Sequence, residues 1–265
     1  MIDVDPAAVR AFHRVRQAAA KASARYAMLQ PGDRVAAALS GGLDSLVMLE
    51  TLIALQKRAP FDFELEAVTF DPGFPDYNLN GIAKYCQMRE VRHSVIAVNV
   101  PEMLEKSPQD RFRRPCVLCS RLRRGKLYGF ARENKFNKIA LGHHADDLME
   151  SLLISLVRGQ GITTMGPNVT ADTANEQQGD LRIIRPLALI DEKTVKCAAG
   201  SFEFPIAGKC PYQAMLDESG DRAWAKRCLS DFARRIPDLH TLMLKSMSKV
   251  EANYLLDKRF LDIEQ

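Results

Sequence analysis

The chain has 265 residues, 46% of them hydrophobic, with a formal net charge of +4 and an isoelectric point near 8.7. This is enough apolar material for a full core, and no apolar run is long enough to cross a membrane. Because the N-terminus lacks the apolar segment of a signal peptide, we expect a cytoplasmic protein with no membrane partner. Its six cysteines are then expected to be thiols or metal ligands rather than disulfides.

A basic amphipathic helix is predicted over residues 6–29, followed by a strand, a glycine turn and a helix over residues 34–55. The turn reads Ser40-Gly41-Gly42-Leu43-Asp44-Ser45. Adjacent glycines let backbone N–H groups approach a ligand, and the following helix directs its positive end to the same place. We therefore predict a phosphate site, with Asp44 acting through a magnesium ion. Ordinary helix capping by Asp44 or Ser45 is the alternative interpretation.

Further strands are predicted over residues 63–70, 94–100, 138–141 and 181–187, alternating with helices. This alternation indicates an α/β fold, a parallel sheet with helices on both faces, whose ligands bind at the carboxyl ends of the strands. Residues 101–115 and 159–167 are expected to be loops. A basic helical tail is predicted over residues 221–258, split in two by Pro237.

Residues 111–128 combine a C-x-x-C pair with the densest basic patch in the chain. Cys116 and Cys119 are spaced to share one metal or cluster, or to act as a redox dithiol. A structural zinc site, or two unrelated core cysteines, gives the same pattern. So many arginines beside paired cysteines favour a phosphate-bearing partner. The basic residues are Arg111, Arg113, Arg114, Arg121, Arg123, Arg124 and Lys126.

The strand predicted at 138–141 ends in a second polar turn, Gly142-His143-His144-Ala145-Asp146-Asp147, which leads into another helix. Two histidines and two aspartates at such a turn can hold magnesium, orient ATP or move a proton, whereas a single aspartate there is more often a helix cap. We predict catalytic roles for Asp44, His143, Asp146 and Asp147. Farther along, Cys210 stands in a turn from which it can reach back to the C-x-x-C pair.

The order of these motifs carries a family resemblance. Ser-Gly-Gly-x-Asp-Ser resembles the PP-loop of ATP pyrophosphatases. Followed by Pro-Cys-x-x-Cys-Ser-Arg-Leu-Arg-Arg, Leu-Gly-His-His-x-Asp-Asp, Ile-Arg-Pro-Leu and a final cysteine, it resembles the tRNA 2-thiocytidine synthetase (TtcA) family over residues 34–210. The chain departs from that family at Leu43, where many members carry lysine. It also departs around Cys210, where Lys-Cys-Pro-Tyr-Gln replaces the common Pro-Cys-x-x-Cys-Gly-Ser-Gln.

The resemblance implies a tRNA-cytidine(32) 2-sulfurtransferase-like reaction, in which ATP adenylates the C2 oxygen of a cytidine and sulfur then replaces that oxygen. It implies magnesium and a [4Fe–4S] cluster on Cys116, Cys119 and Cys210, with Cys197 or Cys228 as alternative third ligands. It also implies tRNA contacts at the arginine patch, a sulfur donor of the cysteine-desulfurase type and a homodimer. The implied nucleotide contacts are Ser40, Gly41, Gly42, Asp44, Ser45, Phe70 and Gly142.

On this interpretation the chain divides into an N-terminal helix (residues 1–30), a PP-loop ATPase domain with the cysteine site (31–215) and a helical tail (216–265). Two other interpretations remain open. Another PP-loop tRNA modifier, similar to lysidine synthetase and carrying structural zinc, explains both polar turns but gives three cysteines no catalytic role. A nucleotide-binding regulatory module without turnover is the second.

Overall fold

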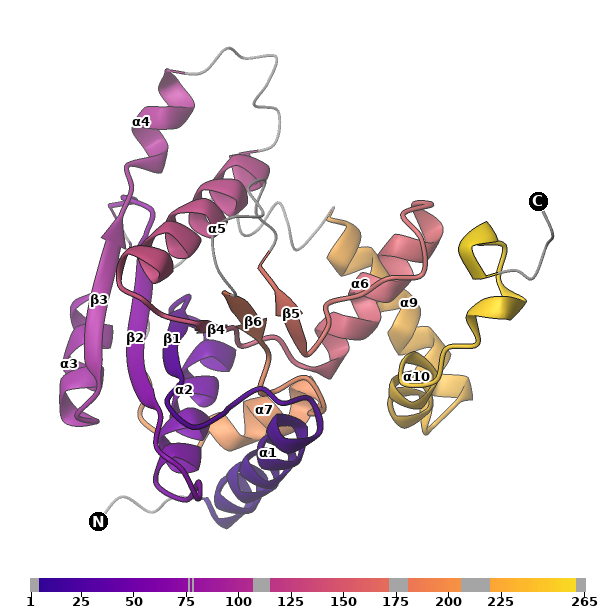
Figure 1. Ribbon diagram of the computed structural model, residues 1–265, viewed down its shortest axis with the longest axis horizontal. Helices are drawn as coiled ribbons and strands as arrows, with labels where there is room; N and C mark the ends of the chain where they lie inside the picture. The colour runs from indigo at the N-terminus through magenta and orange to yellow at the C-terminus, as the bar shows by residue number, and fades with distance from the viewer. Residues whose placement is uncertain are drawn as a thin grey trace.

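The computed structural model describes residues 5–75, 77, 79–106, 115–171, 181–205 and 220–260. Its centre is a six-stranded sheet in the order β3-β2-β1-β4-β6-β5 (Figure 1). Neighbouring strands are parallel, except that β5 runs antiparallel to β6. The predicted α/β fold is therefore confirmed. The strands are β1 (Arg34–Leu39), β2 (Glu64–Asp71), β3 (Arg92–Ala97), β4 (Lys138–Ala140), β5 (Asn168–Thr170) and β6 (Arg182–Ile184).

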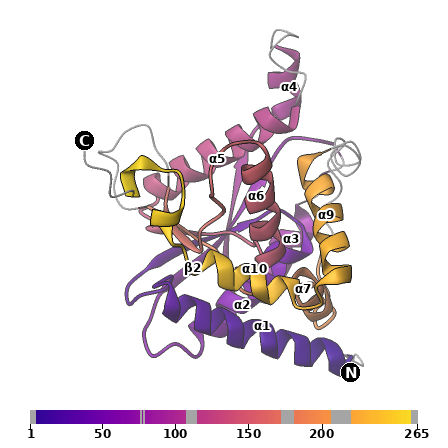
Figure 2. The same ribbon diagram turned by 90° about the vertical axis from the view of Figure 1, so that its right-hand side faces the viewer.

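Helices cover both faces of the sheet because side chains alternate between its faces along each strand. Val35 and Ala37 of β1 face a core shared with α1, α2, α3 and α7, whereas Ala36 faces a second core shared with α5. Figures 1 and 2 show α1, α2 and α7 together on one side and α5 on the other. These helices are α1 (Pro6–Arg25), α2 (Leu43–Gln56), α3 (Asn80–Met88), α5 (Pro115–Glu133) and α7 (Glu192–Ala199).

The chain order reverses beside β1, and this reversal positions the site. After β1 the chain adds β2 and β3 on one side, then returns to place β4 on the other side, pairing Ala36 with Ile139 and Ala37 with Ala140. In open parallel sheets, ligands bind at the carboxyl ends of the strands at such a switch point. The two polar turns predicted from the sequence follow β1 and β4, so both lie at this switch point.

The tail forms two helices, α9 (Asp221–Arg235) and α10 (Leu239–Met247), with the predicted break at Pro237 between them. Both pack against α6 (Ala145–Val157), the helix that follows the second polar turn (Figure 2). Short turns, η2 (Ala252–Tyr254) and η3 (Lys258–Phe260), end the described part of the chain. Within the described ranges, no helix combines the length and apolar character needed to span a membrane.

Several local predictions were wrong. The helix expected over residues 6–29 ends at Arg25, and the strand expected at 181–187 covers only Arg182–Ile184. The strand expected at 94–100 begins at Arg92 and ends at Ala97, and residues expected as loop form the short helix α4 (Val100–Glu105). Strand β5 was not expected from the sequence, because its three residues are too few to show an alternating pattern. Its position depends on distant contacts, since the Asn168 side chain donates to the carbonyls of Tyr26 and Ala27.

Candidate functional site

The loop after β1 is built to present backbone N–H groups. Gly41 has a φ of +78°, which glycine adopts without strain, and the loop is closed by a hydrogen bond from the Ser45 hydroxyl to the Gly42 carbonyl, 2.8 Å. Ser45 Oγ also accepts from the Ser40 amide at 3.2 Å. Helix α2 begins at Leu43. Its N-cap residue, Gly42, has no side chain to accept hydrogen bonds from the amides of the first turn. The amides of the first turn therefore remain available for an anion.

Gly142 brings the second turn against the first. A Cβ placed on Gly142 would lie 3.0 Å from the carbonyl carbon and oxygen of Asp44 and 3.0 Å from Ser45 Cα. A side chain at residue 142 would push the two turns apart by a few tenths of an ångström. The residues predicted from two motifs about 100 positions apart thus lie together. The structure adds Tyr77, whose hydroxyl donates to the Ser40 carbonyl at 2.7 Å and which the sequence analysis did not identify.

Asp44 is half-buried at the start of α2, among other charged groups. Burial raises the pKa of its carboxyl; His144 and Lys196 oppose this shift, and the carboxylates of Asp147 and Glu192 reinforce it. A divalent cation stabilises the ionised form of a carboxyl group most strongly where other carboxylates lie nearby. The surroundings of Asp44 therefore fit the predicted magnesium-mediated contact with phosphates.

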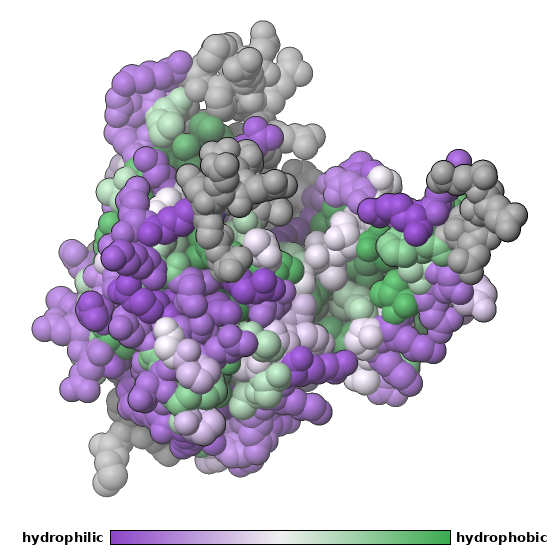
Figure 3. Space-filling model, in the orientation of Figure 1, coloured by the Kyte–Doolittle hydropathy of each residue, from purple (hydrophilic) through white to green (hydrophobic). Residues whose placement is uncertain are grey.

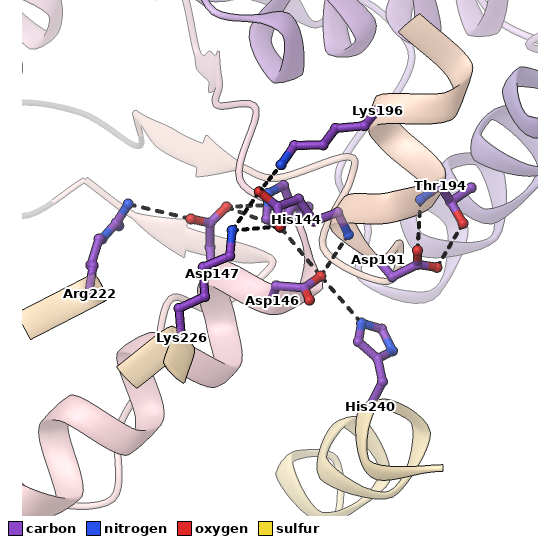
Figure 4. A network of polar contacts seen from close by, with 10 residues as sticks. His144, Asp146, Asp147, Asp191, Thr194, Lys196, Arg222, Lys226 and His240 are labelled. Atoms are coloured by element: carbon purple, nitrogen blue, oxygen red, sulfur yellow. Dashed lines mark hydrogen bonds and ion pairs between the residues drawn. The ribbon is translucent and has the colours of Figure 1, made fainter. Parts of the chain in front are cut away.

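The two aspartates of the second turn organise helix ends (Figure 4). Asp147 Oδ2 accepts from the amide of His144, the N-cap of α6, at 2.9 Å. Asp146 Oδ2 accepts from the amide of Glu192, the first residue of α7, at 2.7 Å. Burial alone would raise the pKa of Asp146, but contacts with His240, the Glu192 amide and His144 outweigh burial and lower it. The capping alternative thus holds in part for both residues, whose catalytic roles stay predictions.

His143, the second residue of this turn, is half-buried. Arg185, the residue after β6, directs its Nε toward His143 Nδ1 at 3.3 Å. Burial lowers the pKa of His143 to about 4; Asp147 opposes the shift, and Arg185, Arg222 and His144 add to it. The imidazole is therefore neutral at physiological pH.

Helix α5 brings the arginine patch to the same edge of the sheet. Arg123 lies over the ring of Phe70, with its guanidinium carbon 5.5 Å from the ring centroid, and Phe70 is only 6% exposed. Cys119 is half-buried against the same small core as Phe70. Arg121, Arg123 and Arg124 are exposed to solvent and free to contact a large anion. The predicted role of Phe70 at the nucleotide stays a prediction.

Comparison with known proteins relates this arrangement to a family. A model described as the PP-loop domain matches residues 11–199. A tRNA-cytidine(32) 2-sulfurtransferase of Pelobacter propionicus is 35% identical over 257 residues, covering 94% of this chain and 90% of that protein. The enzyme of the same name from Hahella chejuensis is 37% identical, covering 95% and 85%. The chain belongs to the tRNA-cytidine(32) 2-sulfurtransferase family of PP-loop proteins.

The structure of the U34-tRNA thiolase NcsA from Methanococcus maripaludis, solved with its [4Fe–4S] cluster, resembles the chain with a TM-score of 0.71 and 21% identity. That comparison covers 90% of this chain and 78% of NcsA. At this identity it establishes a shared fold. The sequence resemblance to the tRNA 2-thiocytidine synthetase family is confirmed by the curated relatives.

The cysteines expected in this sulfurtransferase family member are only partly described. The Cys116 backbone lies in the first turn of α5, whereas its side chain, Cys210, Arg111, Arg113 and Arg114 lie outside the described residues. Cys197 belongs to the core of α1, α2 and α7, on the face of the sheet opposite Cys119, which argues against it as the third ligand. Where side chains are described, no group of three or more His, Cys, Asp or Glu is arranged to hold a metal.

Three tail residues, an arginine, a lysine and a histidine, reach the carboxylates of this sulfurtransferase site, and none of them was expected there from the sequence (Figure 4). Arg222 of α9 lies 3.4 Å from Asp147, and Lys226 binds Glu192 at 2.6 Å. His240 of α10 lies 3.6 Å from Asp146. No local spacing connects residues so far apart, so only the packing of α9 and α10 on α6 reveals the contacts.

Proposed function

We propose that this chain is an ATP-dependent tRNA-cytidine 2-sulfurtransferase acting at the cytidine that its relatives' name specifies, position 32. The observation that carries the proposal is the meeting of the glycine loop at α2, the Gly142 turn and the cysteine-bearing end of α5 at one edge of the sheet. Membership of the family supports the reaction class.

In the first step the loop at Ser40–Ser45 binds the phosphates of ATP through amides at the N-terminus of α2. Asp44 fits a magnesium ion, whose charge would neutralise the phosphate oxygens. The C2 oxygen of cytidine attacks the α-phosphorus, and the bond to the β-phosphate breaks, releasing pyrophosphate. This step converts the C2 oxygen, which is a poor leaving group, into part of AMP, which leaves readily.

In the second step sulfur forms a bond to C2 and AMP departs with the oxygen. The thiol donor set of Cys116, Cys119 and Cys210 fits an iron–sulfur cluster, and Cys119 is half-buried against the same small core as Phe70, near the end of β2. Such a cluster would supply iron to which the incoming sulfur could bind. The exposed arginines of α5 hold phosphates of the anticodon loop, whose unstacked cytidine is easily presented.

The proposal extends to the assembly. A cysteine-desulfurase-type protein supplies the sulfur, and the enzyme works in the cytoplasm as a homodimer. Apolar side chains exposed on the tail offer a surface for a second copy, shown in green over the C-terminal segment in Figure 3. They include Phe232, Ile236, Leu242, Tyr254 and Leu256. We also propose that the chain divides into an N-terminal helix (residues 1–30), a PP-loop ATPase domain (31–215) and a helical tail (216–265). Helix α1 packs on α7, and α9 packs on α6.

The test is anaerobic turnover of purified protein with ATP, magnesium, tRNA and a sulfide source, measured as pyrophosphate release and as 2-thiocytidine by mass spectrometry. The wild-type protein is expected to contain about four irons per chain and to form both products. Cys119→Ser should lose iron and thiolation while it still binds ATP. Stoichiometric zinc, or pyrophosphate release without thiolated cytidine, would contradict the proposal.

A further inference from the structure

Arg185 and His143 form a hydrogen bond that has no role in the reaction proposed above. β4 and β6 are adjacent strands, pairing Ala140 with Ile184, and the two residues follow the carboxyl ends of these strands. Arg185 is only 8% exposed. It is fixed at both ends: its amide donates to the Pro167 carbonyl at 2.9 Å, and its guanidinium donates to the Gly166 carbonyl.

The chemistry of the two side chains determines where the imidazole proton lies. A guanidinium has only donors and no acceptor. Because Arg185 Nε directs its N–H at His143 Nδ1 at 3.3 Å, Nδ1 must offer its lone pair. A doubly protonated imidazolium has no lone pair to offer, and a neutral imidazole with a free Nδ1 carries its proton on Nε2. The lowered pKa of His143 agrees with this neutral form.

We propose that Arg185 is a positioning residue that fixes His143 as the Nε2–H tautomer, so that His143 donates a hydrogen bond to a phosphoryl oxygen of the nucleotide. The proposal rests on the proposed function, because it uses the same site. His143 directly follows Gly142, the residue through which this turn touches the first turn of α2. With Nδ1 occupied by Arg185 and Nε2 protonated, His143 has no lone pair left to act as a general base.

The tautomer is measured directly by nitrogen-15 NMR of the histidine side chains in the full-length protein. The chain has five histidines, and the His143→Gln variant identifies the signals of His143 by their loss. We expect a protonated Nε2 and an unprotonated Nδ1 at pH 7 in the wild type, and a mixture of tautomers in Arg185→Met. A proton on Nδ1, an imidazolium, or an unchanged tautomer in Arg185→Met would overturn the proposal. This readout does not depend on activity.

Two amide variants, each of which replaces one ring nitrogen, test the donor role. In His143→Gln the amide N–H₂ takes the place of Nε2–H, whereas in His143→Asn it takes the place of Nδ1. Loss of one preorganised donor to developing charge lowers the rate by about 100-fold. We expect Asn to show this loss in kcat for pyrophosphate release, and Gln to retain activity within about tenfold of the wild type. Equal losses in both variants would overturn the donor role. A wild-type protein with no pyrophosphate release would instead reject the proposed function, while the NMR result would still decide the tautomer.

Discussion

Gly142 lies so close to the first turn of α2 that a Cβ on it would come within 3.0 Å of the Asp44 carbonyl oxygen. The two polar turns are therefore assembled as one unit, and their relative position depends on the missing side chain. This contact involves backbone atoms, which cannot rotate away as the end of a flexible side chain can. The site should respond strongly to the smallest possible enlargement of residue 142.

We predict that Gly142→Ala lowers kcat/KM for pyrophosphate release by at least about tenfold, because small displacements of reacting groups have large effects on rate. The matched control is Gly129→Ala, where an added Cβ meets nothing within 4 Å and the residue lies inside α5. Alanine favours a helix over glycine by about 1 kcal/mol, so the control should be at least as stable as the wild type. Full activity in Gly142→Ala would show that the turns need not touch.

Asp44→Asn is predicted to separate stability from activity. The carboxylate is half-buried near Asp147 and Glu192, and its raised pKa shows that the folded protein disfavours the charged form. A group whose folded pKa lies above its unfolded pKa destabilises the fold at neutral pH when it is ionised. The neutral amide should therefore unfold at an equal or higher temperature by calorimetry, while pyrophosphate release falls by about 100-fold or more. A less stable but active variant would contradict both parts.

The sequence predicted the alternation of strands and helices because long buried strands and amphipathic helices leave periodic patterns. It also placed both polar turns at strand ends, and the parallel sheet then brings such ends to one edge. It could not predict β5, which is three residues long and is held by Asn168, nor the ion pairs of the tail with Asp147 and Glu192. Those features arise from contacts between distant segments, for which a single sequence carries no periodic signal.

The tail contacts lead to a prediction for Lys226, which lies on α9 and binds Glu192 together with Lys196. The site gathers the carboxylates of Asp44, Asp146, Asp147 and Glu192, and these would repel the phosphates of ATP without nearby cations. Lys226→Met should raise KM for ATP by about three- to tenfold, an electrostatic effect of roughly 1 kcal/mol. The effect should shrink as salt is added.

The control for Lys226 is Arg234→Met, on the same helix. Arg234 is 78% exposed and pairs only with Asp231, three residues earlier on that helix, among the described contacts. We expect its KM for ATP to equal that of the wild type. An equal rise in KM in both variants would show that the net charge of α9, and not its contact with Glu192, supports ATP binding.

His143 leads to a prediction about acid stability. Its pKa is lowered to about 4 in the folded protein, mainly by burial, whereas an unfolded histidine titrates near 6.5. Between these values the unfolded chain binds more protons, so the contribution of His143 to the free energy of unfolding is fully present above about pH 6.5 and is lost as the pH falls toward 4.

The matched control is His143→Gln, which keeps the groups that face residue 143, namely Asp147, Arg185, Arg222 and His144. Urea unfolding from pH 7.5 to 4.5 should therefore show a larger loss of free energy of unfolding in the wild type than in the variant. Greater acid resistance in the wild type would mean that the folded protein favours the protonated imidazole, which cannot accept from Arg185.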